Sequence, residues 1–196
     1  MKVTPLDTTE LTEMLIVSTS PRSSGLHMST LYNDLYARLE PKRFAKGGPL
    51  DALKMGAGLA LESVLEAALK ERFVQLAVRP GELLTVDGIA YSPDLVIFNG
   101  ETRLGEIKLT WMSSKSVPRK PDNGFPDKFG KWLCQMQCYC HELETPFARL
   151  IGFFVNGSYK PMQPELLAWD FEFSTREIDE TWAMVMNNAR HQGLIR

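Results

Sequence analysis

The chain has 196 residues, of which 44% are hydrophobic and 23% are charged, and its formal net charge is −2. These values are ordinary for a globular protein and favour one domain with a sizeable core. No apolar run approaches the length of a membrane span, and the segment before residues 14–17 is acidic, the wrong flank for a signal peptide. We therefore expect an intracellular protein with no membrane partner. The net charge alone does not indicate a nucleic-acid-binding protein.

The N-terminal region is expected to be an irregular arm over residues 1–25, because its periodicity is weak and it ends in a polar run. A single domain is expected over residues 26–196. Leucines at a spacing of four predict its first helix over residues 27–40, with Ser29 or Thr30 as the candidate cap.

A second, longer helix is predicted over residues 50–73, where Pro49 and Asp51 provide start signals. Its apolar stripe contains Glu62, and a carboxylate that faces a core without a partner is costly. Either Glu62 has a partner such as a metal or a lysine, or the helix is rotated and Glu62 lies at its edge. The pattern leaves both alternatives open.

A strand, a turn at Pro80 and Gly81, and a second strand are predicted within residues 74–86. Asp87 and Gly88 provide a further turn or bend directly after them.

A β-hairpin is predicted around Asn99 and Gly100, which stand between two runs of strand-forming residues. A two-residue loop would place Asp94 opposite Gly105. A three-residue loop that ends at Gly100, in a left-handed bulge, would place Asp94 opposite Leu104 instead. The sequence allows both registers, and we favour the second.

Only the second of these registers brings Asp94, Glu106 and Lys108 onto one face of the sheet. Two carboxylates beside an ammonium suit a hard cation such as Mg²⁺ or Mn²⁺. Lys108 could then orient or deprotonate a water that the metal has acidified. The alternative is a cross-strand salt bridge on a solvated sheet.

A long polar loop over residues 112–130 follows the hairpin, and loops of this length are often functional or mobile. Its basic residues come directly after Lys108 and could hold a nucleic-acid strand, although a solvated linker would have the same composition. The candidate DNA-binding residues are Lys115, Arg119, Lys120, Lys128 and Lys131.

A third helix is predicted over residues 131–143, and it places Gln135 and Tyr139 on one face, from which both could reach the hairpin. Both side chains could equally be ordinary core residues. All three cysteines of the chain lie in this helix, and we expect buried, reduced thiols. They are Cys134, Cys138 and Cys140.

Two further strands are predicted over residues 148–156 and 166–173, and a capping box at Ser174 starts a last helix that runs to about Arg190, with Gly193 as its stop signal. The order of elements predicts an α/β domain with a central mixed β-sheet flanked by helices.

Four pieces of the sequence, in the expected order, together resemble the PD-(D/E)XK nuclease superfamily. Pro-Asp at residues 93–94 and Glu-Ile-Lys at residues 106–108 resemble its signature. Glu62 fits the early acidic ligand, and Gln135 with Tyr139 matches the Gln-x-x-x-Tyr motif of the RecB-like branch. The resemblance covers the chain from about residue 58 to Tyr139 and implies a restriction-endonuclease-like core.

The flanking segments 26–29 and 154–157 look like those of phage-encoded members. Many RecB-like relatives have a histidine where Glu62 stands, and a glutamate is closer to the lambda-exonuclease pattern. This departure leaves the number of metal ions and the strand polarity open. Some relatives hold an iron–sulfur cluster through four cysteines, and three cysteines cannot complete one, so we expect no such cluster.

The resemblance implies a role for each matching residue. The implied ligands of Mg²⁺ or Mn²⁺ are Glu62, Asp94, Glu106 and the backbone carbonyl of Ile107. Lys108 would position and activate the attacking water, Gln135 would orient the site or the scissile phosphate, and Tyr139 would support it.

The expected function is therefore metal-dependent hydrolysis of DNA, by an exonuclease that acts in phage recombination or repair. The expected partner is double- or single-stranded DNA, and the resemblance leaves room for a homo-oligomer and a recombination partner protein. A phage-encoded protein would work in the host cytoplasm. Alternatives are a structure-specific or nonspecific endonuclease, a catalytically idle relative that binds DNA or a partner protein, and a sheet protein whose acid–lysine pairs are structural.

Overall fold

The computed structural model describes residues 25–44, 49–72, 77–80, 84–98, 100–117, 125–156 and 163–196. The predicted N-terminal arm lies outside these ranges up to residue 24, and so do Arg119, Lys120 and the side chain of Glu62. Within the described ranges, no helix has both the length and the apolar character that crossing a membrane requires.

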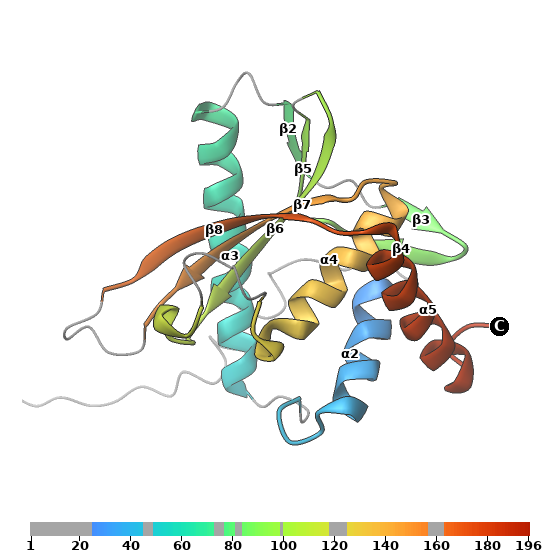
Figure 1. Ribbon diagram of the computed structural model, residues 1–196. Coiled ribbons are helices and arrows are strands. Elements are labelled where there is room, and N and C mark those ends of the chain that lie inside the picture. The colour runs from blue at the N-terminus through green and yellow to red at the C-terminus, as the bar shows by residue number, and fades with distance from the viewer. Residues whose placement is uncertain are drawn as a thin grey trace, which may run out of the picture.

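In the described ranges, eight strands form two sheets, and the larger sheet passes between the helices (Figure 1). The five-stranded sheet has the order β2-β5-β6-β7-β8, and the three-stranded sheet has the order β1-β4-β3. The strands are β1 (Leu26–His27), β2 (Ala77–Pro80), β3 (Leu84–Val86), β4 (Ile89–Tyr91), β5 (Leu95–Phe98), β6 (Thr102–Thr110), β7 (Phe147–Phe154) and β8 (Glu165–Glu172). The larger sheet is mixed, because β6 and β7 pair in parallel and its other neighbours are antiparallel.

The helices are α2 (Met28–Leu39), α3 (Pro49–Arg72), α4 (Gly130–Glu142) and α5 (Thr175–His191), with single 3₁₀ turns η1 (Ser114–Ser116) and η2 (Asp127–Phe129). The four predicted helices are confirmed, each within about one residue of its predicted bounds. The mixed α/β class is confirmed as well, with one difference. The two strands predicted within residues 74–86 join different sheets, since β2 pairs with β5 and β3 pairs with β4.

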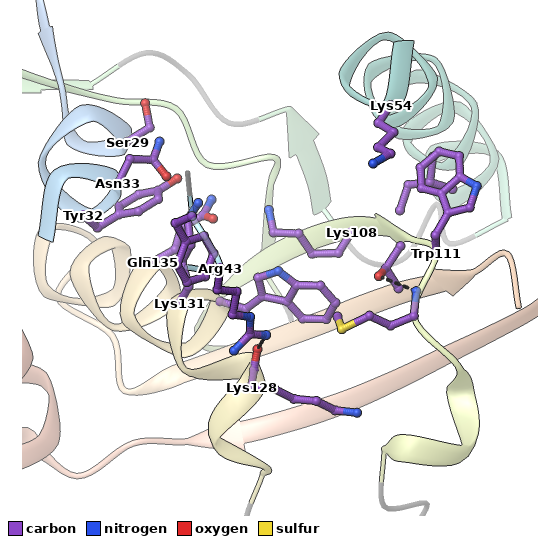
Figure 2. Close-up of a pocket in the computed structure, with 15 residues that line it drawn as sticks. Ser29, Tyr32, Asn33, Arg43, Lys54, Lys108, Trp111, Lys128, Lys131 and Gln135 are labelled. Atoms are coloured by element: carbon purple, nitrogen blue, oxygen red, sulfur yellow. Dashed lines mark hydrogen bonds between the residues drawn. The ribbon is translucent and has the colours of Figure 1, made fainter. Parts of the chain in front are cut away.

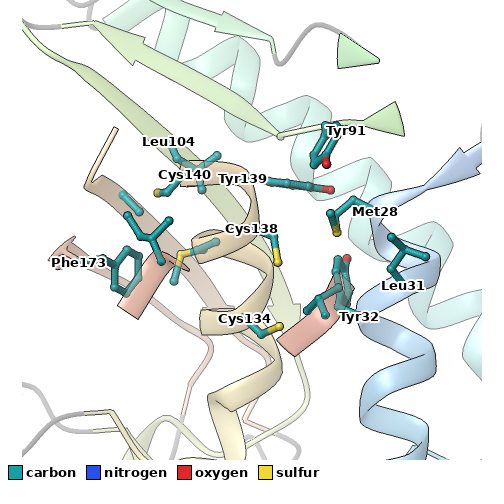
Figure 3. Packing of buried hydrophobic residues seen from close by; sticks show 14 of the residues in the cluster. Met28, Leu31, Tyr32, Tyr91, Leu104, Cys134, Cys138, Tyr139, Cys140 and Phe173 are labelled. Atoms are coloured by element: carbon teal, nitrogen blue, oxygen red, sulfur yellow. The ribbon is translucent and has the colours of Figure 1, made fainter. Parts of the chain in front are cut away.

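Helices cover both faces of the five-stranded sheet. On one face, α3 packs through Leu65 on a small cluster, whose buried members are Leu95, Ile107 and Ile151. On the other face lies the main core, to which α2, α4 and α5 contribute, and Figure 3 shows α4 and α2 packed through Cys138, Tyr139, Met28 and Leu31. Because side chains alternate along a strand, Glu106 faces α4 while Ile107 faces α3.

The hairpin forms, but both predicted registers are wrong. Phe98 pairs with Thr102, which leaves a three-residue loop with Gly100 in its middle at φ +78°. Continued by one residue, this pairing places Asp94 opposite Glu106. The difference from the favoured register is two residues, and an even shift keeps every side chain on its face. The predicted shared face of Asp94 and Glu106 therefore holds.

The predicted cap of α2 is also wrong. His27 occupies the N-cap position and makes no side-chain hydrogen bond there. The physical reason is that the chain enters α2 directly from β1, whose residues pair in parallel with β4. The extended backbone at His27 is set by the sheet and leaves no turn in which Ser29 or Thr30 could act as the cap.

Other local signals are confirmed. Asp87 and Gly88 have φ values of +50° and +76°, and they form the tight turn between β3 and β4. Ser174 and Glu177 make the reciprocal hydrogen bonds of a capping box at the start of α5. Gly193, at φ +67°, follows its end.

Candidate active site

Among the strands of the described residues, none pairs with one edge of the second half of β6, which we call the open edge. On one side, β7 pairs with β6 over residues 104–110, but on the other side β5 pairs only with residues 102–105. Asp94 lies just before β5, and its Oδ2 accepts a hydrogen bond from the backbone nitrogen of Ile107 at 2.7 Å. The N–H and C=O of one strand residue point to the same side, so the carbonyl of Ile107 faces this same edge.

Glu106 is the charged residue at the centre of the site, and it is 0% exposed. Its Oε1 accepts hydrogen bonds from Nζ of Lys108 and, at 2.6 Å, from Nε2 of Gln135. Lys108 comes from the same face of β6, and Gln135 comes from the middle of α4. A buried carboxylate is stable only when it is paired and hydrogen-bonded, and these two donors meet that requirement at Oε1, whereas the buried Oε2 accepts no hydrogen bond from the described residues.

Tyr139 lies on α4 one turn after Gln135 and is also buried. Its pKa is raised above the ordinary tyrosine value, first by burial and then by the nearby Tyr32, Glu106 and Asp94. The pKa of Tyr32 is raised in the same way by burial, Glu106 and Asp94. Both phenols therefore interact electrostatically with both carboxylates, and both remain neutral hydrogen-bonding groups at neutral pH.

Tyr32 is a site residue that the sequence motifs do not predict. It lies on α2, about sixty residues before Asp94, and the core residues of that helix show the ordinary apolar period. A weak signal exists beside it, because the polar residues Ser29, Tyr32 and Asn33 have spacings of three and four. All three line one pocket together with Lys108 and Gln135.

This pocket has a volume of about 850 Å³ and lies along the open edge of β6, between α3 on one side and α2 with α4 on the other. Figure 2 shows Lys108 between Tyr32 and Gln135 on one side and Lys54 and Trp111 on the other. Within the described residues, its lining contains five basic side chains and no acidic one. The basic residues are Arg43, Lys54, Lys108, Lys128 and Lys131.

The cations of the pocket lie close enough to affect one another. The pKa of Lys131 is lowered, first by burial and then by repulsion from Lys108 and Arg43. Aromatic rings hold two of these cations, because Nζ of Lys131 lies 4.8 Å from the ring centroid of Phe44 and the guanidinium of Arg43 lies 5.3 Å from it. The concentrated positive charge favours an anionic ligand.

The predicted DNA-binding residues separate into three groups. Lys128 and Lys131 line the pocket, whereas Lys115 is exposed in η1 and is not among the lining residues. Arg119 and Lys120 lie outside the described residues. Two cations that the motifs do not predict, Arg43 after α2 and Lys54 on α3, take part instead. Arg43 is held by a hydrogen bond to the carbonyl of Lys128 and by Oε2 of Glu40 at 3.1 Å.

The oxygen groups near Lys108 suit a hard divalent cation. Asp94, Glu106 and the carbonyl of Ile107 come together at one edge, and carboxylate and carbonyl oxygens are what Mg²⁺ and Mn²⁺ prefer. Within the described side chains, no group of three or more histidine, cysteine or carboxylate residues is arranged so that it could hold a metal ion. The predicted role of Glu62 stays a prediction, since its side chain lies outside the description; its helix packs by Leu65 on the sheet face opposite Glu106.

The three cysteines are buried and free, as predicted. Burial raises the pKa of the Cys140 thiol to about 12. The pKa of Cys138 is also raised, by its hydrogen bond with Cys134 and by burial. The Cys138 and Cys140 thiols are therefore protonated packing groups of the core.

Similarity to solved structures places the fold among known proteins. No protein-family model matches the chain, and no curated protein matches it. Among solved structures, it is similar to SSO0001 (TM-score 0.56, 15% identity, 95% of this chain and 89% of that chain). It is also similar to the alkaline exonuclease LHK-Exo from Laribacter hongkongensis (TM-score 0.53, 17% identity, 91% and 85% covered).

A third similar structure is a phage-related exonuclease from Haemophilus somnus 129PT (TM-score 0.50, 14% identity, 83% and 78% covered). The chain shares the fold of these exonuclease structures. At such identities the likeness shows the fold alone, and the function has to be argued from the site.

Proposed function

We propose that the chain is a divalent-metal-dependent deoxyribonuclease that hydrolyses phosphodiester bonds, and that it acts as an exonuclease. The observation that carries this proposal is the buried Glu106. It is held by Lys108 and Gln135 beside Asp94, at an open strand edge that borders a pocket lined by cations. A carboxylate pair with a lysine, next to a binding place for polyanions, is suited to hydrolysing a phosphodiester.

Asp94, Glu106 and the carbonyl of Ile107 would hold the cation, with Glu62 as a further ligand. When bound, a divalent cation supplies charge stabilisation to the phosphate and acidifies a water. The side chains fix the arrangement, because Asp94 is oriented by the N–H of Ile107 and Glu106 by Gln135. Such hydrogen bonds to metal-binding groups set their direction and basicity.

Lys108 has two tasks in this proposal. It neutralises Glu106 in the protein alone, and its ammonium reaches the pocket, where it would orient the attacking water toward the phosphate. Gln135 keeps the carboxylate in place, and Tyr139 supports the site from the next turn of α4. Arg43, Lys128 and Lys131 would bind the flanking phosphates.

The exonuclease mode is supported by the neighbours in fold. One of them, LHK-Exo, is also known in complex with dAMP, in a structure that matches with a TM-score of 0.50 and 16% identity. A mononucleotide is the kind of product that stepwise degradation from an end releases. We include a role in phage recombination or repair in the proposal on the same ground.

The test is cleavage of end-labelled linear DNA and covalently closed circular DNA in Mg²⁺, in Mn²⁺ and in EDTA. We expect loss of linear DNA with either metal, no loss in EDTA, and intact circles. Asp94→Asn and Lys108→Met should each lower the rate by about 10²-fold or more. Arg176→Met removes the same charge as Lys108→Met from the exposed face of α5, where its side chain is 84% exposed, and should leave the rate unchanged.

Asp94→Asn is informative because an amide oxygen can still accept from Ile107, so the fold should persist while the charge is lost. Cleavage of closed circles would show an endonuclease. Tight, salt-sensitive DNA binding without cleavage in either metal would show the idle relative and would reject the proposal.

A further inference from the structure

Trp111 is an unusual residue of the pocket. It follows β6 directly, three residues after Lys108, and is 45% exposed. Tryptophan is enriched at interfaces, so an exposed tryptophan beside a site is a candidate contact residue. Figure 2 shows Trp111 next to Lys54, on the side of Lys108 that faces away from Arg43 and Gln135.

The open edge of β6 explains why Trp111 is available. Five consecutive residues, 108–112, line the pocket, because within the described residues no strand covers this edge of the sheet. The pocket therefore runs along the backbone from Lys108 to Trp111. A ligand that reaches Lys108 can extend over the indole ring without displacing any described strand.

A second tryptophan stands in the same pocket. Trp132 belongs to α4, and its ring centroid lies 4.8 Å from that of Phe129, which limits its rotation. Tyr32 and Phe44 complete the aromatic lining, and Nζ of Lys131 lies 6.0 Å and 4.8 Å from their ring centroids. Aromatic rings thus alternate with cations around the pocket, and its described lining has no carboxylate.

This combination identifies the chemistry of the ligand. Cations bind phosphates of any nucleic acid, but exposed rings stack on the faces of bases, and successive bases offer those faces only where they are unpaired. Within a duplex, each base face is covered by its neighbours in the stack, except the outer faces of the terminal pairs. The aromatic half of the pocket therefore favours single-stranded over double-stranded nucleic acid.

We propose that this pocket is a subsite for unpaired nucleotides of the strand that is cut, in which Trp111 stacks on a base while the cations around Lys108 bind the phosphates. The proposal deepens the nuclease function proposed above and rests on it. It assigns a substrate form, an unpaired strand end, that the carboxylates and Lys108 alone do not select.

The experiment measures binding in EDTA, where no turnover occurs. Three probes of about 12 nucleotides are compared: a single strand, the same single strand with several abasic positions, and a blunt duplex. Binding is followed by tryptophan fluorescence and by anisotropy of a labelled end. We expect the single strand to quench the fluorescence and to bind more tightly than the duplex. We expect the abasic strand, which keeps every phosphate, to lose most of the quenching.

Variants assign the effect to Trp111. Trp111→Ala should weaken binding of the single strand by roughly 5- to 150-fold, the range that stacking on one base supplies, and leave abasic binding nearly unchanged. Trp111→Phe should restore most of the affinity. Phe98→Ala is the matched control, since Phe98 is 52% exposed at the opposite end of the β5–β6 pairing. Trp182→Phe controls the fluorescence, because Trp182 stacks on His141 and is not a lining residue.

Several results would overturn the subsite: equal binding of normal and abasic strands, tighter binding of the duplex, no binding of the single strand, or a change of less than twofold in Trp111→Ala. These failures are separate from failure of the proposed function. A protein that cleaves DNA yet binds equally well without the Trp111 ring refutes only the subsite. A protein that binds single strands through Trp111 but cleaves DNA with neither Mg²⁺ nor Mn²⁺ refutes only the proposed nuclease function.

Discussion

The ion pair between Glu106 and Lys108 has an asymmetry that mutation can measure. The Glu106 side chain is 0% exposed, whereas that of Lys108 is 20% exposed and borders the pocket. Lys108→Met would remove the ammonium from a buried carboxylate that Gln135 also holds, and removing one member of a buried pair costs about 3–5 kcal/mol. We expect the free energy of unfolding to fall by that amount.

The opposite substitution should cost less. In Glu106→Gln the amide can still hydrogen-bond with Gln135, and the ammonium of Lys108 can turn toward the water in the pocket, so we expect a loss of about 1 kcal/mol. The double variant removes both charges. It should therefore be about 2–4 kcal/mol more stable than Lys108→Met alone.

Urea unfolding at neutral pH in EDTA measures the stability of the unchanged protein, the two single variants and the double variant. Lys131→Met is the control. The pKa of Lys131 is lowered first by burial and then by repulsion from Lys108 and Arg43, so removing its charge relieves both and should change stability by less than about 1 kcal/mol. Adding Mg²⁺ should restore part of the stability of Lys108→Met, because a cation that binds only the folded state stabilises it. The reasoning is refuted if Lys108→Met loses less than about 1 kcal/mol, or if the double variant is no more stable than Lys108→Met.

Three further predictions concern Gln135, the tyrosines and the thiols. Gln135→Met should weaken Mn²⁺ binding by about 10–100-fold, whereas Gln137→Met, on the same helix but bonded to Thr181, should not; equal effects would contradict the site. The pKa values of Tyr32 and Tyr139 are raised, and that of Tyr36 is raised to about 12, so folding favours the neutral phenols. The contribution of these neutral phenols to stability is complete below pH about 10 and is lost as the pH rises above it. Tyrosinate absorbance should then rise together with alkaline unfolding, and ionisation of these groups at pH about 10 in the folded protein would disagree. The three buried thiols should react with a thiol reagent only in denaturant; rapid reaction of the folded protein would show that the core opens.

The elements of the fold could be predicted where the signals are local. The bounds of the helices follow from apolar periodicity and from residues that start or stop a helix, and Ser174 and Gly193 act as predicted. The hairpin register could not be predicted in the same way. Its parity depends on the loop, and the loop begins after Phe98 because that residue still pairs with Thr102. Only the structure shows how far the pairing extends.

The residues of the site likewise divide into those that a local sequence signal predicts and those that only the fold brings together. Asp94, Glu106, Lys108 and Gln135 could be predicted from motif spacing, and the structure brings them together. Three lining residues that the motifs do not predict come from elements distant in the chain, and their arrangement depends on how α2 and α3 pack on opposite faces of the sheet. Those residues are Tyr32, Arg43 and Lys54. Apart from the polar spacing around Tyr32, no local pattern indicates such packing, because each of these side chains is ordinary in its own segment.

One residue of the motif explains why the site exists at this position. If the pairing of β5 and β6 continued beyond Asp94, Pro93 would stand opposite Ile107 in a hydrogen-bonded pair. Proline has no N–H, so Pro93 cannot donate to the carbonyl of Ile107, and the ladder ends there. The carboxylate of Asp94 accepts from the N–H of Ile107 in place of a strand. The same proline thereby prevents β5 from starting earlier and leaves the carbonyl of Ile107 directed at the edge. It also opens the side of β6 along which the cation-lined pocket extends.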